Sequence, residues 1–436
     1  MALSIAVAMA GAACTDDASE RDTVVLWAMG TEAEVADQLL DGFRAEHPTI
    51  PVRVQALPWS AAHEKLLTAF VGDSMPDVFQ LGNTWVPELA MLGALEPLDD
   101  RIEASTLVTR SDYFEGSLVP NELEGRLLAL PWYVDTRLLF YRRDLLEQVG
   151  VTDAPRTWEE WRVAMKRVRD AAPKTGADSR YGVFLPIEEW QTPVILSLQQ
   201  GAQLLRDDDS YGNFRSPEVR RAVEFYVGLF RSDLAPQKSD AQVANIYREF
   251  AAGYFAYFVT GPWNLAELSK RLPTELADAW ATAPMPAPSG PAPVVSVPEV
   301  PVPGVSVPGV SVSGGASLAI SATSTRKDSA WKLVEYLSST PMQVRFYSQS
   351  GDLPPRRSAW QAPELANDPR TQAFRTQLDH LASTPKIPEW ERIAAKMKLH
   401  LERIVRGDAS VDEALAELDA DVDAILAKRR ALRGKA

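Results

Sequence analysis

The stretch that decides the fold reads Leu130-Pro-Trp-Tyr-Val-Asp-Thr-Arg-Leu-Leu-Phe-Tyr-Arg-Arg-Asp144. Pro131 excludes a helix through its neighbours and keeps Leu130 extended, because the proline ring fixes φ and crowds the preceding residue. The residues from Thr136 to Tyr141 are rich in strand formers. We therefore predict an extended segment that runs into a strand.

Within this stretch, an aromatic ring and a carboxylate share one side of the chain. Side chains alternate along a strand, so Tyr133 and Asp135 are expected to point the same way. Such a pair suits a sugar, because the ring covers the apolar face of a pyranose while the carboxylate accepts hydrogen bonds from hydroxyl groups. The alternative is a buried aromatic strand in which Asp135 pairs with Arg137 or caps a turn.

The composition is that of an acidic globular chain. Its 436 residues predict roughly two or three domains with an ample core. The hydrophobic and charged fractions, 46% and 24%, exclude wholesale disorder. A formal net charge of -14 argues against nucleic acid as a partner and against adhesion to anionic membrane surfaces.

The usual motifs of catalysis and metal binding do not occur in the sequence. We find no Gly-rich phosphate loop and no HExxH or GxSxG pattern. The four His are scattered, and a single Cys permits neither an internal disulfide nor a cysteine-based zinc site. We therefore expect no catalytic residue, no metal and no cofactor.

The first thirteen residues form the one hydrophobic run that could target the chain. It is too short to span a bilayer, but it suits the apolar part of a secretory signal. Small residues precede Cys14, as in the bacterial lipoprotein signal, where this cysteine is acylated and becomes the mature N-terminus. The match departs at Gly11, where Leu is usual, and no Lys or Arg precedes the run. The alternative is a cysteine in a small-residue leader.

Strands and helices alternate over the first part of the chain. We predict strands at residues 23–27, 52–57 and 75–83 and helices at 34–47, 61–71 and 84–92. Such alternation implies parallel sheets with helices on both faces, and ligands then lie beyond the carboxyl ends of the strands. Three loops take that position, at residues 30–32, 81–85 and 132–135.

After Asp144 the chain is mostly helical. Thr157 and Glu160 have the spacing of a capping box, and the apolar pattern predicts helices at 216–232 and 239–253. Residues 284–313 are foreign in composition, with Val-Pro-Gly-Val-Ser twice in succession, and are expected to form an insertion in a surface loop. The strand that follows begins with two glycines, which allow close approach of a ligand or another strand.

Several features occur in a fixed order along the chain. They are a leader ending in Cys14, the strand and loop at Trp27, Pro76-Asp-Val78, Pro131-Trp-Tyr-Val-Asp135, Gly261-Pro-Trp-Asn264, Gly314-Gly315, Leu353-Pro-Pro-Arg356 and a terminal Gly-x-x-Ser-x-x-Glu-Ala-Leu run. In this order they resemble the extracellular sugar-binding proteins of bacterial ATP-driven importers, the group that contains the maltose- and trehalose/maltose-binding proteins. The chain departs from that pattern in its weak leader and in the insertion.

The resemblance implies an α/β fold of the two-lobed periplasmic-binding-protein type II, with the ligand cleft between lobes that crossing hinge strands join. It covers almost the whole mature chain apart from residues 284–313. The implied boundaries are a leader and tether at 1–22, a first lobe at 23–132 plus 283–346 (with the low-complexity insertion at 286–313), and a second lobe at 133–282 plus 347–436.

Carried over position by position, the resemblance implies eight ligand-binding residues. They are Glu32 and Asn83 as polar groups of the first lobe, Tyr133 and Asp135 beside the hinge, Trp190 and Trp263 as stacking rings, Gly315 as a backbone contact and Arg356 as a cation at the edge of the second lobe. The alternatives are turn or cap residues for the first two, core packing for the indoles and plain solvent exposure for the cation. Trp59 and Trp85 are further subsite candidates without an assigned place.

The resemblance further implies binding without chemistry. We expect the substrate-binding component of an ABC-type importer, a monomer that binds an oligosaccharide, an α-glucoside such as maltose or trehalose. Its other partner is the transmembrane part of the permease, and its location is the periplasm or cell surface, with a lipid anchor at Cys14. One alternative is a receptor for glycerol phosphodiesters or another polar solute, with Arg356 on the phosphate. Another is a glycosidase with Glu32 and Asp135 as paired carboxylates.

Overall fold

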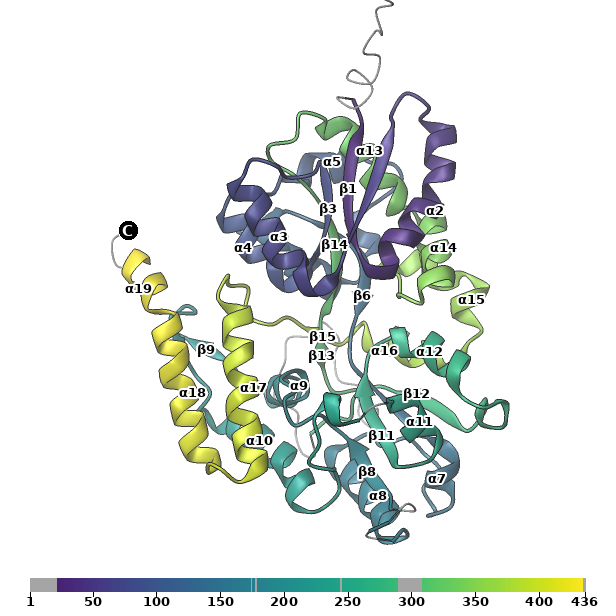
Figure 1. Ribbon diagram of the computed structural model, residues 1–436, viewed down its shortest axis with the longest axis vertical. Helices are drawn as coiled ribbons and strands as arrows, with labels where there is room; N and C mark the ends of the chain where they lie inside the picture. Colours follow the sequence, from purple (N-terminus) through teal and green to yellow (C-terminus); the bar gives the residue numbers. More distant parts are fainter. Residues whose placement is uncertain (1–21, 174, 177–178, 244, 289–307, 434–436) are drawn as a thin grey trace, which may run out of the picture.

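The computed structural model describes residues 22–173, 175–176, 179–243, 245–288 and 308–433. They form two α/β lobes, stacked one above the other in Figure 1. Each lobe is built on its own sheet, with strand order β2-β1-β3-β14-β6 in the first lobe and β12-β7-β11-β8 in the second. The two-lobed fold predicted from the sequence is confirmed.

The first lobe's sheet is mixed. Its strands are β1 (Val24–Met29), β2 (Val52–Leu57), β3 (Val78–Gly82), β6 (Leu130–Asp135) and β14 (Gly314–Ile320). β1 is parallel to β2 and β3, whereas β14 is antiparallel to both β3 and β6. The prediction of parallel sheets is therefore wrong for this edge, because β14 enters the sheet from the second lobe and runs in the opposite direction.

Helices cover both faces of this sheet, as predicted. They are α2 (Gly30–Glu46), α3 (Trp59–Val71), α4 (Val86–Met91), α5 (Asp99–Ala104), α6 (Glu115–Leu118), α13 (Lys327–Leu337) and α14 (Thr340–Ser350). Successive β1 residues face opposite cores, since strand side chains alternate. Leu26 and Ala28 pack with α2 and α13, and Trp27 and Met29 pack with α3.

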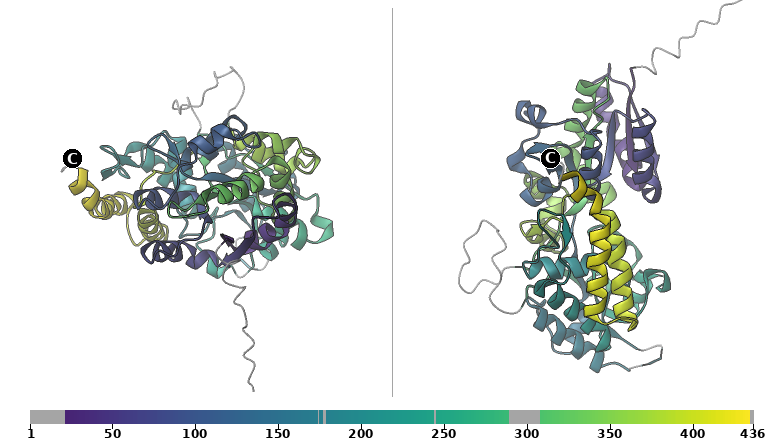
Figure 2. Two further views of the ribbon diagram at one scale, coloured as in Figure 1. Left: turned by 90° about the horizontal axis from the view of Figure 1, so that it is seen from above. Right: turned by 90° about the vertical axis from the view of Figure 1, so that its left-hand side faces the viewer.

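The second lobe's sheet is also mixed. Its strands are β7 (Leu138–Arg142), β8 (Tyr181–Phe184), β11 (Phe255–Thr260) and β12 (Trp280–Ala283). β7 is antiparallel to β11 and β12, and β11 is parallel to β8. The helices here are α7 (Arg143–Glu147), α8 (Trp158–Asp170), α9 (Gln191–Gln199), α10 (Pro217–Arg231), α11 (Ile246–Ala251), α12 (Trp263–Arg271), α15 (Pro363–Ala366), α16 (Pro369–Gln377), α17 (Trp390–Arg406), α18 (Val411–Ile425) and α19 (Ala427–Arg433). The α17–α18 pair lies along this lobe (Figure 2).

Local sequence signals decide where two of these helices begin. Thr157 and Glu160 form the predicted capping box of α8. The helix predicted at 239–253 is wrong, because the described residues there form a short 3-10 turn (Asp240–Gln242) and then α11. α11 starts only after Asn245, whose side chain accepts a hydrogen bond from the backbone N–H of Arg248 and so acts as its N-cap.

Crossing segments join the lobes. β6 of the first sheet continues into β7 of the second, and the chain returns from β13 (Ser311–Val312) into β14. A third segment pairs with β6 at the same place, since the Val134 N–H donates a hydrogen bond to the carbonyl of Leu353. We predicted the return at residue 283, but Met285 and Val312 pack in the second lobe's core. The chain therefore reaches the first sheet only at Gly314.

The insertion is anchored on the second lobe. The Gly309 N–H donates to the carbonyl of Met285 at 2.9 Å, and the Ala287 N–H donates to the carbonyl of Arg156 at 2.9 Å. Residues 289–307 of the insertion, and the leader with Cys14, lie outside the described residues. Over the described ranges, no helix is long and apolar enough to cross a membrane.

Candidate ligand site

Glu32 and Tyr133 meet beside the crossing strand β6. Glu32 lies in the first turn of α2 and is buried, with 8% of its surface exposed. Its Oε1 atom accepts hydrogen bonds from the Tyr133 hydroxyl at 2.9 Å and from the Trp59 indole Nε1 at 3.2 Å. One carboxylate oxygen therefore links three segments that are far apart in the sequence.

Gln80 fixes Tyr133 from the neighbouring strand β3. Its Oε1 accepts from the backbone N–H of Met29 at 2.7 Å, and its Nε2 donates to the Tyr133 hydroxyl at 3.3 Å. Burial, with the nearby charges of Asp352 and Glu32, raises the pKa of Tyr133 well above its ordinary value. The hydroxyl therefore stays protonated and acts as the donor to Glu32.

Asp135 stands at the end of β6, where the second lobe begins. Its Oδ1 accepts from Nη1 of Arg137 at 2.6 Å, and the Arg137 guanidinium lies 4.7 Å from the ring centroid of Trp263. Trp263 begins α12 in the second lobe and is 37% exposed. Burial raises the pKa of Asp135, and the Arg137 charge offsets part of that rise.

Glycines make this close packing possible. A Cβ atom on Gly261 would lie 2.0 Å from the Trp263 ring and 2.7 Å from Oδ1 of Asp135. Gly315 has φ +111, and its Cβ would lie 2.4 Å from the carbonyl oxygen of Tyr133. The predicted close approach of the Gly315 backbone to another strand is confirmed, while its contact with a ligand stays a prediction.

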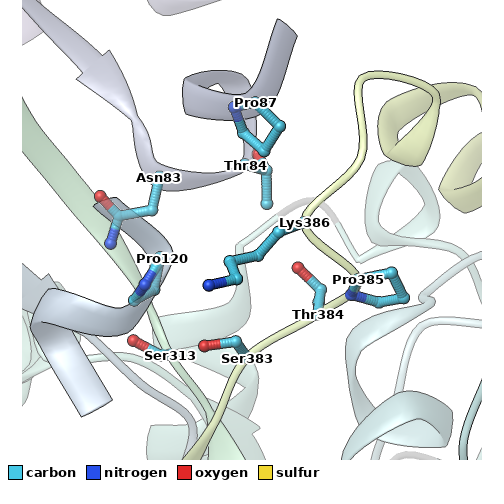
Figure 3. Close-up of a pocket in the computed structure, with 9 residues that line it drawn as sticks. All are labelled: Asn83, Thr84, Pro87, Pro120, Ser313, Ser383, Thr384, Pro385 and Lys386. Carbon is cyan, nitrogen blue, oxygen red and sulfur yellow. The ribbon is translucent and has the colours of Figure 1, made fainter. Parts of the chain in front are cut away.

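Asn83 is held by the same part of the sheet. Its Nδ2 donates to the carbonyl of Gly314 at 3.0 Å, and its Oδ1 accepts from the Ser317 hydroxyl at 2.9 Å. It lines a small pocket between the lobes, drawn in Figure 3, in which Lys386 points toward Pro120. Both functional groups of the amide already have protein partners.

Asp352 also belongs to this group, although the sequence did not predict it as a site residue. It follows the left-handed Gly351 at the end of α14 and directly precedes Leu353, the partner of Val134 on the crossing strand. Burial and the charges of Glu32 and Asp135 raise the pKa of Asp352 to about 8. The sequence drew attention to this loop only through its arginines, and no local pattern marks the acid.

Two predicted ligand residues, Trp190 and Arg356, make their contacts with residues outside this group. The Trp190 ring packs edge-on against Trp390 at 5.6 Å, on the second lobe's core. The Arg356 guanidinium is buried and donates to Asp112 at 2.7 Å and to the carbonyl of Ser338 at 2.9 Å. These contacts give Arg356 a structural role, so we leave it out of the ligand set proposed below.

The group as a whole offers acceptors and an exposed ring. Glu32, Asp135 and Asp352 carry carboxyl groups, Arg137 carries the cation that pairs with Asp135, and Trp263 presents the indole. In the part of the chain that the structure describes, no three His, Cys, Asp or Glu side chains gather as a metal site. Two lobes, crossing strands and this polar and aromatic group define a two-lobed binding protein.

Comparison with known proteins agrees. Residues 30–344 match the model of the bacterial extracellular solute-binding protein family, and the chain belongs to that family. The structure is similar to that of the sugar-binding protein MalE from the phytopathogen Xanthomonas citri, with a TM-score of 0.87 and 46% identity over 95% of this chain and 100% of that one.

Two more distant relatives also match over more than nine-tenths of both chains. The diacetylchitobiose binding protein DasA of Streptomyces coelicolor is 25% identical over 94% of this chain and 93% of its own. The GacH receptor of Streptomyces glaucescens is 25% identical, with a TM-score of 0.75 over 93% of this chain and 98% of its own. The resemblance to sugar-binding proteins of ABC importers is confirmed.

Proposed function

We propose that this protein is the substrate-binding component of an ABC-type carbohydrate importer and that it binds an oligosaccharide, an α-glucoside such as maltose or trehalose. The observation that supports this proposal most strongly is that β6 brings side chains of both lobes together. Its Tyr133 donates a hydrogen bond to Glu32 of the first lobe, and its Asp135 pairs with Arg137, whose guanidinium lies over the ring of Trp263 in the second lobe. One bound molecule at this strand would touch both lobes.

The mechanism is a clamp that closes on its ligand. The sugar stacks on Trp263, and its hydroxyls donate to the oxygens of Glu32 and Asp135. A ligand that contacts both lobes binds the closed arrangement better than the open one, and closure then becomes favourable. No bond is made or broken, and Glu32 and Asp135 act as hydrogen-bond acceptors.

Relatives support an oligosaccharide ligand. MalE of Xanthomonas citri is a sugar-binding protein, DasA is named for diacetylchitobiose, and the GacH receptor was solved in complex with acarbose. In the proposed ligand set, the acceptors Glu32 and Asp135 outnumber the one cation, Arg137, which is already paired with Asp135. This balance disfavours a phosphodiester, because like charges repel in a desolvated site. Because the chain belongs to an extracellular solute-binding family, we also place the protein outside the cytoplasm. There its closed form meets the transmembrane subunits of the permease.

A thermal-shift screen tests this proposal. Ligands that bind only the folded state raise the melting temperature, by an amount set by their concentration and affinity. The panel contains glucose, maltose, trehalose, maltotriose, diacetylchitobiose and glycerophosphocholine. We expect the largest shift with an α-linked di- or trisaccharide. A shift with glycerophosphocholine alone would overturn the carbohydrate assignment.

A further inference from the structure

Two indoles differ from all the others in the chain. All twelve Trp lie in the described ranges, and ten of them are buried or half-buried. Trp59 is 38% exposed and Trp263 is 37% exposed. Trp59 belongs to the first lobe and Trp263 to the second, so each lobe presents one exposed indole.

The edge of the Trp59 ring is held in place while much of the side chain stays open to solvent. α3 begins at this residue, directly after Pro58, and the Nε1–H of the ring donates to Oε1 of Glu32 at 3.2 Å. Trp85 packs edge-on against it with ring centroids 5.8 Å apart and an interplanar angle of 63°. Trp85 is supported in turn by the His63 ring at 4.9 Å.

The backbone of Gly30 also packs closely against the Trp59 ring. Gly30 has φ +48, and a Cβ atom at this position would lie 3.3 Å from Cδ1 of Trp59 and 3.0 Å from Oε2 of Glu32. Trp59 is therefore adjacent to the same carboxylate that Tyr133 contacts. A positioned indole beside an acceptor oxygen repeats, in the first lobe, the pairing of Trp263 with Asp135 through Arg137 in the second.

We propose that Trp59 is the stacking platform of the first lobe and that it receives a second sugar ring, distinct from the ring on Trp263. This inference rests on the proposed function and deepens it, because it assigns one sugar ring of the oligosaccharide to each lobe. Stacking uses the π-face of the indole, whereas Glu32 needs only its N–H. The two contributions can therefore be separated by substitution.

The test is calorimetric titration of the full chain with maltose and glucose, or with the disaccharide of largest thermal shift and its monosaccharide unit. The variants are Trp59→Phe, which keeps a ring without the N–H donor, and Trp59→Ala, which keeps neither. We expect Trp59→Ala to weaken disaccharide binding about tenfold and Trp59→Phe to weaken it no more than about threefold. For the unchanged protein, we expect the monosaccharide to bind at least about tenfold more weakly than the disaccharide.

Each contrary result has one meaning. Equal losses in Trp59→Phe and Trp59→Ala would make Trp59 a positioning residue for Glu32 and would overturn the stacking assignment. Unchanged affinity in Trp59→Ala would remove Trp59 from the site, and equal affinity for mono- and disaccharide would overturn the two-ring assignment. Failure of the unchanged protein to bind any sugar would instead overturn the proposed function. Melting temperatures measured without sugar confirm that each variant is folded.

Discussion

The hydroxyl of Thr84 donates a hydrogen bond to Oε1 of Glu391, 2.5 Å away, and so joins the two lobes directly. Thr84 follows β3 in the first lobe, and Glu391 lies in the first turn of α17 in the second. Nearby, Nζ of Lys386 donates to the carbonyls of Val119 and Glu122 at 3.3 and 2.9 Å. Figure 3 shows Thr84 and Lys386 around the same small pocket.

Thr84→Val should weaken sugar binding without touching the sugar. The substitution keeps the shape and removes the donor, and a hydrogen bond to a charged group contributes about 1.5–3 kcal/mol. In the proposed clamp, lobe opening separates these two side chains. The loss then falls on the closed form, and we expect dissociation to accelerate roughly fivefold or more. Stopped-flow tryptophan fluorescence measures the rate. Thr106→Val, at an exposed threonine, is the matched control, and equal rates in the two variants would contradict the prediction.

Gly261→Ala should disrupt the site at a single methyl group. The new Cβ would lie 2.0 Å from the Trp263 ring and 2.7 Å from the Asp135 carboxylate, so one of them must move. We expect sugar affinity to fall more than about tenfold, with some loss of stability from overpacking. Calorimetry measures the affinity. Gly228→Ala is the control, because no atom lies within 4 Å of its added Cβ, and an unchanged affinity in Gly261→Ala would refute the packing argument.

Trp263→Ala should remove the second lobe's exposed ring. Stacking contributes roughly 1 kcal/mol beyond the burial of apolar area, so the total loss should exceed tenfold in affinity. Trp263→Phe should retain most of it, since a smaller ring still covers a pyranose face. Titration calorimetry of both variants decides the matter. Wild-type affinity in Trp263→Ala would place the ligand elsewhere.

Asp352 makes stability depend on pH. Its pKa is about 8 in the folded protein and near 3.8 in the unfolded chain, so the folded state binds the proton more tightly. This carboxyl therefore lowers stability progressively as the pH rises from about 4 to about 8, and the deficit is constant above that range. Asp352→Asn removes the deficit.

We expect Asp352→Asn to be more stable than the unchanged protein, by at least about 1 kcal/mol at pH 8 and by little at pH 4. Urea unfolding at the two pH values measures the difference. Asp278→Asn, at an exposed carboxylate, controls for the loss of one negative charge. A stability gain that is the same at both pH values would show that the Asp352 carboxyl does not titrate abnormally.

Local signals in the sequence predicted local structure well. β2 occupies the predicted residues 52–57, and the capping box at Thr157 begins α8 as expected. Both features depend on neighbours within a few residues. The direction of β14 and the late return of the chain at Gly314 depend instead on the pairing of β14 with β6, strands that are about 180 residues apart in the sequence. The Pro-Val-Gly insertion hid that boundary.

The candidate site was predicted only in part, because some of its features depend on contacts between residues far apart in the sequence. Glu32, Tyr133, Asp135 and Trp263 come together because β6 crosses between lobes, which the family resemblance implied. Asp352 could not be predicted, because its pKa comes from burial and from two charges more than 200 residues away. Arg356 was expected at the ligand, yet Asp112 pairs with it, and no local pattern links the two.

The most direct test of the account is a calorimetric titration with the best sugar of the panel, followed by chromatography of the recovered sugar. The account predicts one saturable site per chain, heat that Trp263→Ala diminishes, and a sugar returned intact after hours at the working temperature. Absence of heat with every sugar, or recovery of a hydrolysed product, would contradict it.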